Sequence, residues 1–175
     1  PESTEYEPPK GYFQKLIRSD HGWVLLDQQW RATGFDDLGR LSYETDEFAQ
    51  QAALAAGTNA GNVVRYLYDS SGRLGQIVDP VERANELTYW RDNEASQTGA
   101  YPGLLKQVKD WRDRTTLYEY DSFGRLVRVK APEAAAASGV PSEFNFTGNN
   151  RPRTEYTYQS VPLPPATSTP IQAFN

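Results

Sequence analysis

The sequence predicts an all-β protein in which consecutive antiparallel β-hairpins form one curled sheet. The first observation is composition: the 175 residues include 11 Tyr, 4 Trp, 13 Gly and 12 Pro, which favours strands joined by many tight turns. The second is a period-two alternation of apolar and aromatic residues. The third is a turn sequence that recurs along the chain.

The recurring turn reads aromatic–Asp–x–x–Gly–Arg–Leu. We expect its Asp to accept a hydrogen bond from the backbone two residues on, and its Gly to take a positive φ. The Arg can then stack on a Tyr of the facing strand. These roles are structural. The three copies are Phe35, Asp36, Gly39, Arg40 and Leu41; Tyr68, Asp69, Gly72, Arg73 and Leu74; and Tyr120, Asp121, Gly124, Arg125 and Leu126.

The strands that lead into the turns place large residues on one face. Because side chains of a strand alternate between its two faces, every second residue shares a face. The uninterrupted unit spans about 21 residues, from Tyr68 to Tyr89. The alternating sets are Val64, Tyr66 and Tyr68; Leu87 and Tyr89; Thr116, Tyr118 and Tyr120; and Thr154, Tyr156 and Tyr158.

The chain divides into a Pro-rich linker at 1–10, a repeat region at 11–158 and a Pro-rich tail at 159–175 that could pair with a neighbour. A first hairpin is expected over 11–30, and the repeats are clearest over 62–132. Insertions occupy 47–61, 91–102 and 133–152. One short helix is expected over 46–57, with Asp46 as N-cap and Gly57 as its stop.

Two full copies resemble the RHS repeat, also called the YD repeat. One is Tyr68-Asp69-x-x-Gly72-Arg73-Leu74 followed by Asp79-Pro80; the other is Tyr118-Glu119-Tyr120-Asp121-x-x-Gly124-Arg125-Leu126 followed by Pro132. Residues 33–46 and 153–158 carry weaker versions. The family usually has Gly where Glu82 and Asp113 stand, so we expect looser turns there.

The resemblance implies a segment of a large exported protein. RHS-repeat proteins include bacterial toxins, insecticidal toxin subunits, wall-associated proteins and teneurins, and their repeats wind into a hollow β-shell. We therefore expect a non-catalytic segment that is secreted or displayed at the cell surface. Its partners would be the rest of its own polypeptide or neighbouring repeat subunits, and an encapsulated effector. The Asp-based self-cleavage motif of some such shells is not recognisable here.

Composition narrows the function classes. A net charge of −5 and a pI near 5.0 argue against nucleic acid as a partner, because phosphate binding needs a basic face. The sequence has no Cys, and no apolar stretch is long enough to span a bilayer. The single His21 falls in a turn. We expect no catalytic residue, metal or cofactor.

The four Trp residues support an alternative, a carbohydrate-binding or adhesin module. Trp23, Trp30, Trp90 and Trp111 fall at strand ends or beside turns, where an indole face could stack on a sugar. Trp90 replaces an Asp of the repeat and Trp111 a Pro, so these two are the candidate glycan-binding residues. The rings could equally cap a thin sheet. A subunit of a surface filament is a further alternative.

Overall fold

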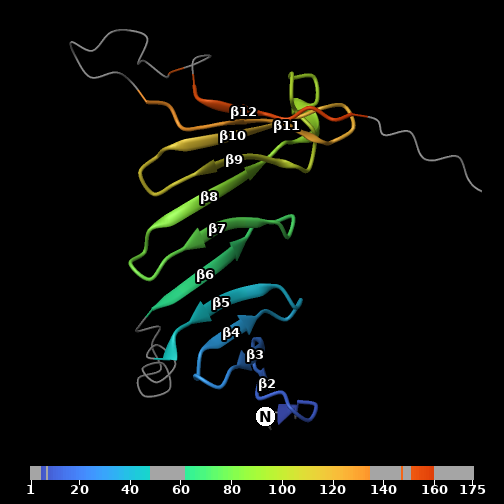
Figure 1. The fold of residues 1–175 in the computed structure, drawn as a ribbon. Helices are drawn as coiled ribbons and strands as arrows, with labels where there is room; N and C mark the ends of the chain where they lie inside the picture. The colour runs from blue at the N-terminus through green and yellow to red at the C-terminus, as the bar shows by residue number, and fades with distance from the viewer. Residues whose placement is uncertain (1–4, 7, 48–61, 135–146, 148–150, 160–175) are drawn as a thin grey trace, which may run out of the picture.

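The computed structural model describes residues 5–6, 8–47, 62–134, 147 and 151–159. They form one antiparallel sheet of twelve strands whose order in space follows the chain, as Figure 1 shows. The all-β class and the consecutive hairpins are confirmed. The strands are β1 (Glu5–Tyr6), β2 (Lys15–Ser19), β3 (Gly22–Leu26), β4 (Ala32–Phe35), β5 (Leu41–Thr45), β6 (Val63–Tyr68), β7 (Leu74–Val78), β8 (Ala84–Tyr89), β9 (Leu105–Lys109), β10 (Thr115–Tyr120), β11 (Leu126–Lys130) and β12 (Arg153–Glu155).

The connections alternate between the two sides of this ribbon because each strand pairs only with its chain neighbours. We call one the glycine-turn side; it carries the turns that contain Gly39, Gly72 and Gly124, and also the β2–β3 and β8–β9 connections. The opposite side carries the β3–β4, β7–β8 and β9–β10 turns. It also carries the β5–β6 and β11–β12 connections, which hold two of the three expected insertions.

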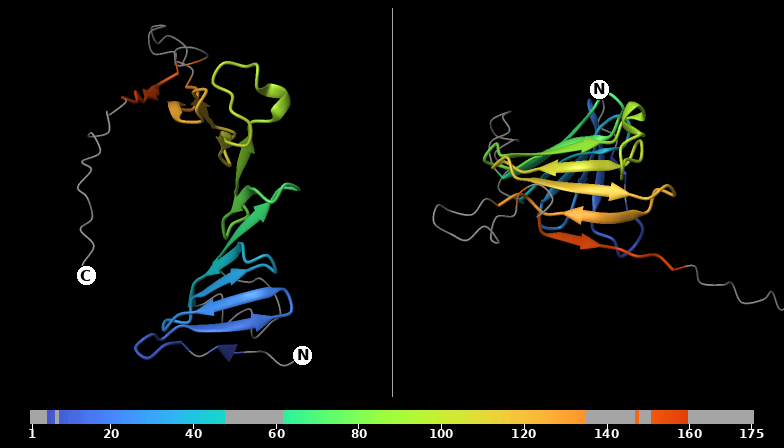
Figure 2. Two further views of the ribbon diagram at one scale, coloured as in Figure 1. Left: turned by 90° about the vertical axis from the view of Figure 1, so that its right-hand side faces the viewer. Right: turned by 90° about the horizontal axis from the view of Figure 1, so that it is seen from above.

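The two sides of the ribbon differ in register. The pairs β4–β5, β6–β7, β8–β9 and β10–β11 each shift by one residue next to the glycine-turn side. The pairs β3–β4, β7–β8 and β9–β10, which close on the opposite side, keep one register throughout. An extra residue in one strand bends it and increases the local twist. The curl of the sheet, visible in Figure 2, therefore has a cause that recurs along one side only.

The middle of the sheet has two unlike faces. Residues paired across strands share a face. The apolar face holds the pairs Tyr66–Ile77, Leu87–Val108 and Tyr118–Val129, together with Val64. The charged face holds Arg65, Glu86, Lys109, Glu119, Arg128 and Lys130.

Few side chains are buried, because the described sheet is a single layer (Figure 2). The buried apolar residues among those described are Leu26, Ala32, Val63, Val78 and Trp90. Val78 pairs across strands with Arg65, and Leu26 pairs with Ala32. Val78, Leu26 and Ala32 lie at strand ends on the side of the ribbon away from the glycine turns. The apolar face itself remains partly exposed along its whole row.

Three details differ from the expectations or lie beyond them. The expected linker contains β1, which pairs with Leu16 and Ile17 of β2. The expected insertion at 91–102 contains a 3-10 turn over Asp92–Glu94. The helix expected over 46–57 and the tail lie almost wholly outside the described residues.

We predict that Gly39→Ala destabilises the chain by about 1–2 kcal/mol, since the left-handed conformation costs an L-residue that much. Gly39 has φ +76° and no atom within 4 Å of an added Cβ, so backbone strain alone would act. Gly75→Ala is the control, because its nearest neighbours would lie 3.6 Å away in ordinary contact and its φ is not positive. Urea unfolding measures both, and equal losses would contradict the prediction.

Candidate functional site

Six turns of the sheet share one hydrogen-bonded arrangement, and together they are the most regular polar feature of the molecule. Each begins with an Asp and ends with an Arg four residues later. The Asp side chain accepts the backbone N–H groups two and four residues on, and the Nε–H of that Arg, over 2.6–3.0 Å. The pairs are Asp27–Arg31, Asp36–Arg40, Asp69–Arg73, Asp79–Arg83, Asp110–Arg114 and Asp121–Arg125.

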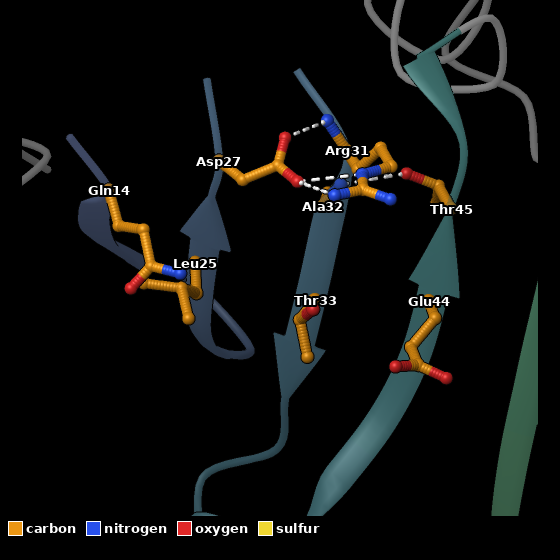
Figure 3. Close-up of a pocket in the computed structure, with 8 residues that line it drawn as sticks. All are labelled: Gln14, Leu25, Asp27, Arg31, Ala32, Thr33, Glu44 and Thr45. Carbon is orange, nitrogen blue, oxygen red and sulfur yellow. Dashed lines mark hydrogen bonds and ion pairs between the residues drawn. The ribbon is translucent and has the colours of Figure 1, made fainter. Parts of the chain in front are cut away.

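The turn at Asp69 shows how the sequence sets this geometry. Asp69 Oδ1 accepts the N–H groups of Ser71 and Arg73 at 2.9 Å, and Oδ2 accepts Arg73 Nε–H at 3.0 Å. The backbone adds Gly72 N–H to Asp69 O at 2.9 Å and Asp69 N–H to Arg73 O at 2.7 Å. This is a type I turn closed by a left-handed residue, as the sequence predicts. We call this set of hydrogen bonds, from one Asp side chain to two backbone N–H groups and to the Arg four residues on, the aspartate clasp. Figure 3 shows the clasp between Asp27 and Arg31.

The fourth residue of every such turn has a positive φ, whether or not it is Gly. Glu82 has φ +63° and Asp113 has φ +61°, and both turns keep all the hydrogen bonds of the Gly-containing ones. The expectation that these two turns are looser is therefore wrong. The clasp supplies enough hydrogen bonds to hold a non-Gly residue in a conformation that it seldom adopts.

The clasp also shifts the acidity of its carboxylates. At Asp36 and Asp69 the largest cause is the backbone N–H of the Arg four residues on, which holds the pKa of each Asp below the ordinary value of 3.8. The guanidinium of the same Arg acts in the same direction. The folded state therefore favours ionised carboxylates in these turns.

On the glycine-turn side, successive hairpins are joined by a ladder of Tyr side chains. Tyr68 donates its hydroxyl to Leu41 O, Tyr89 to Leu74 O and Tyr158 to Leu126 O, each at 2.8 Å. Each ring also lies under the Arg next to that Leu. The ring–guanidinium distances are 4.3 Å for Tyr68–Arg40, 4.6 Å for Tyr89–Arg73 and 4.7 Å for Tyr158–Arg125.

Each of these Tyr residues, with its hydroxyl bond and its Arg contact, is called a rung here. Arg40 and Arg73 stack, as expected, on a Tyr of a neighbouring strand, and that strand begins or belongs to the next hairpin along the ribbon. The hydroxyl bond and the cation–π contact come from the same ring. The repeat motif is thus both a turn and a connector between neighbouring turns.

One turn on the glycine-turn side, between β8 and β9, is built differently. Trp90 N–H donates to Leu104 O, and Gly103 N–H donates to Trp90 O, so Trp90 and Leu104 take the backbone places of the Asp and Arg. Trp90 is 8% exposed, and its Nε1–H donates to Tyr118 O at 3.2 Å. Lys106 lies over its ring and pairs with Glu94. Residues 91–102 are therefore an insertion inside a repeat turn.

The two Trp residues named as glycan candidates have unlike surroundings. Trp90 is buried, so its ring has no open face for a sugar. Trp111 is 44% exposed at the tip of the β9–β10 turn, in the place that Pro80 takes in the β7–β8 turn. The guanidinium groups of Arg83 and Arg112 lie over its ring at 4.9 and 4.3 Å.

A hollow of about 270 Å³ lies beside the first clasp and is drawn in Figure 3. Its polar groups already have partners: Asp27 binds Arg31, Thr45 Oγ1 accepts Ala32 N–H at 3.1 Å, and Glu44 accepts the hydroxyl of Tyr66 at 2.6 Å. That last bond, with smaller contributions from burial and from the charges of Glu44 and Tyr68, raises the pKa of Tyr66 to about 12. The hollow therefore offers a ligand few unengaged polar groups.

The remaining chemistry-bearing residues are dispersed. His21 is exposed in the β2–β3 turn. Within the described ranges, no three His, Asp or Glu side chains are grouped so that they could hold a metal ion. Over the same residues, no helix has the length and apolarity needed to cross a membrane.

No protein-family model matches this chain, and the search of curated proteins gives no relative.

We predict that Tyr89→Phe lowers the free energy of unfolding by about 0.5–1.5 kcal/mol, the net contribution of one hydrogen bond. The change removes the bond to Leu74 O but keeps a ring over Arg73. Tyr156→Phe is the control, since no hydrogen bond involves the Tyr156 hydroxyl within the described part of the chain. Urea unfolding measures both; equal effects would show that the rung does not contribute.

A second prediction concerns acid. Because the pKa of Asp69 is lowered in the folded state, its ionised form stabilises the fold above the ordinary value of 3.8. That stabilisation is lost as the pH falls through 3.8 toward the lowered pKa. Asp69→Asn should therefore be less stable than the natural chain near neutral pH, and the difference should shrink in acid. Chemical unfolding along a pH series tests this, and a difference that is constant with pH would contradict it.

Proposed function

We propose that this chain is a non-catalytic structural segment of an exported bacterial RHS/YD-repeat protein. In this role its sheet forms part of a β-shell that encloses or displays a toxin or effector polypeptide. The apolar face carries the proposal: it is a row of large side chains, left partly exposed on a single-layer sheet. Soluble proteins seldom leave an extended, largely apolar surface exposed to water unless something covers it.

The row crosses six consecutive strands, β6 to β11. It includes the cross-strand pairs Leu87–Val108 and Tyr118–Val129, while Asn85 lies opposite Ile77 and Thr116 opposite Val108. One long surface could cover the whole row. Burying aliphatic and aromatic side chains of this size stabilises the covered state in proportion to the apolar area removed from water. An enclosed polypeptide, or another part of the same shell, would supply that cover.

The charged face suits the outside of a shell. Glu119 contacts both Arg128 at 2.6 Å and Lys130 at 2.5 Å, and Arg128 also reaches Glu155 at 3.0 Å. Burial works to raise the pKa of Glu119, but the bonds from Lys130 and Arg128 outweigh it, so the pKa is lowered. These charges neutralise one another within the face, which leaves no strong field for a nucleic acid partner.

The ends of the sheet support a place within a longer ribbon. β12 is three exposed residues long, yet it continues the repeat: Tyr156 N–H donates to Val127 O, and Tyr158 completes a rung on Leu126. Its outer backbone groups face no further strand among the described residues. An open strand of this kind is a template for pairing with a further strand. Additional repeats of the shell would provide that strand.

The test is to isolate the parent protein from its source and compare it with the 175-residue chain. The proposal predicts a parent much larger than 19.7 kDa that releases a separate polypeptide only on denaturation. Hydroxyl-radical footprinting should find Tyr66 and Tyr118 protected in the parent relative to the isolated chain.

Phe123, 78% exposed at a turn tip, is the internal control and should react alike in both. A parent of the same mass as the chain, with Tyr66 and Tyr118 equally reactive in both, would contradict the proposal.

A carbohydrate-binding or adhesin module is the second candidate, favoured by exposed indoles at turn tips. Trp111 is the named residue that remains accessible for it, although a sugar would have to displace a guanidinium from its ring. If Trp111 binds a glycan, Trp111→Ala should abolish retention on an oligosaccharide array without unfolding the chain. Unchanged retention would remove Trp111 from this role.

A further inference from the structure

The β3–β4 turn differs from the other five clasped turns at its left-handed residue. That residue is Trp30, with φ +61°, where three turns have Gly and two have an acidic residue. A bulky side chain at positive φ is strained. The clasp at Asp27 imposes this conformation on Trp30, as the equivalent clasps do on Glu82 and Asp113.

The neighbouring turns show where a left-handed residue sends its side chain. Glu82 pairs with Arg65 at 2.5 Å, and Asp113 pairs with Lys109 at 2.8 Å, both cations of the charged face. The equivalent position on the β3–β4 turn leans over the same face. There Lys15 lies opposite Leu26, as Arg65 lies opposite Val78.

At this place Trp30 helps to form a hollow of about 140 Å³. Trp30 is 58% exposed, and the other aromatic residue in the wall, Phe13, is 68% exposed. The hollow is lined by Phe13, Lys15, Leu26, Asp27, Gln28 and Trp30. Two accessible rings thus stand beside an ammonium group and a side-chain amide.

We infer that the hollow of Trp30 and Phe13 is a carbohydrate-binding site that takes one pyranose unit of a neutral oligosaccharide. The C–H groups of a sugar ring suit the negative face of an aromatic ring, and its hydroxyls suit the side-chain amide of Gln28, which both donates and accepts. The lining holds one cationic and one anionic side chain, so a neutral sugar fits its charge.

This site goes beyond the shell role and rests on the second candidate function, carbohydrate binding. The first experiment therefore tests the function alone: the 175-residue chain is applied to an array of neutral and acidic oligosaccharides. We expect retention on neutral members. Retention on none of them would overturn both the carbohydrate-binding function and this site, and retention on acidic members only would overturn the neutral-sugar assignment.

The second experiment tests the site. The chain is labelled with 5-fluorotryptophan and titrated with the best-retained oligosaccharide, and the four ¹⁹F signals are followed by NMR. Trp30→Tyr assigns the Trp30 signal by its loss. We expect that signal to move on titration while those of Trp90 and Trp111 stay in place. Movement confined to Trp111 would overturn the assignment and place binding at the β9–β10 turn.

A pair of glycine variants separates binding from folding. Trp30→Gly should relieve the strain, so its urea midpoint should rise, while affinity for the oligosaccharide falls about tenfold or more. Asp113→Gly relieves the same positive φ in the β9–β10 turn and should leave affinity unchanged. Phe13→Ala should weaken binding as Trp30→Gly does. Full affinity in both Trp30→Gly and Phe13→Ala would overturn the proposal.

Discussion

The aspartate clasp is the interaction on which the rest of this structure depends. One carboxylate satisfies two backbone N–H groups and orients the guanidinium four residues on, so each of the six clasped hairpins closes through contacts within a five-residue segment. The single-layer sheet has few buried side chains to specify its register. Six clasps specify it locally, at the turns, before any distant part of the chain is involved.

The clasp has a second role: because it orients the Arg, it also connects neighbouring hairpins. Held by its own Asp, the guanidinium of Arg73 presents a flat face on which Tyr89 of the next hairpin lies, and the same Tyr reaches Leu74 O. Rungs and bulges both fall on the glycine-turn side. The bulges bend the strands along that side and curl the ribbon, and contacts between neighbouring hairpins make its stability a sum of local units. An apolar face and a charged face then lie on its two surfaces.

The fold could be predicted from the sequence because its determinants are local. The Gly-containing copies and the alternation before Tyr68 and Tyr120 give the hairpins directly. The clasp at Asp27–Arg31 does not follow from the Gly-containing motif, because Trp30 occupies the Gly place; the Asp-x-x-x-Arg spacing, which all six turns share, is the signal that indicates it. The burial of Trp90 and the stacking partner of each Arg depend on contacts between hairpins, which a single motif does not contain.

Native-state hydrogen exchange of the 175-residue chain, followed by mass spectrometry over a urea series, tests the central claim most directly. If clasps and rungs hold the sheet as local units, amides of β7 to β10 should be the most protected. Protection should fall stepwise toward β2 and β12, with separate opening free energies for successive hairpins. A single opening free energy shared by all strands from β2 to β12 would contradict the account, because it would mean one cooperative core.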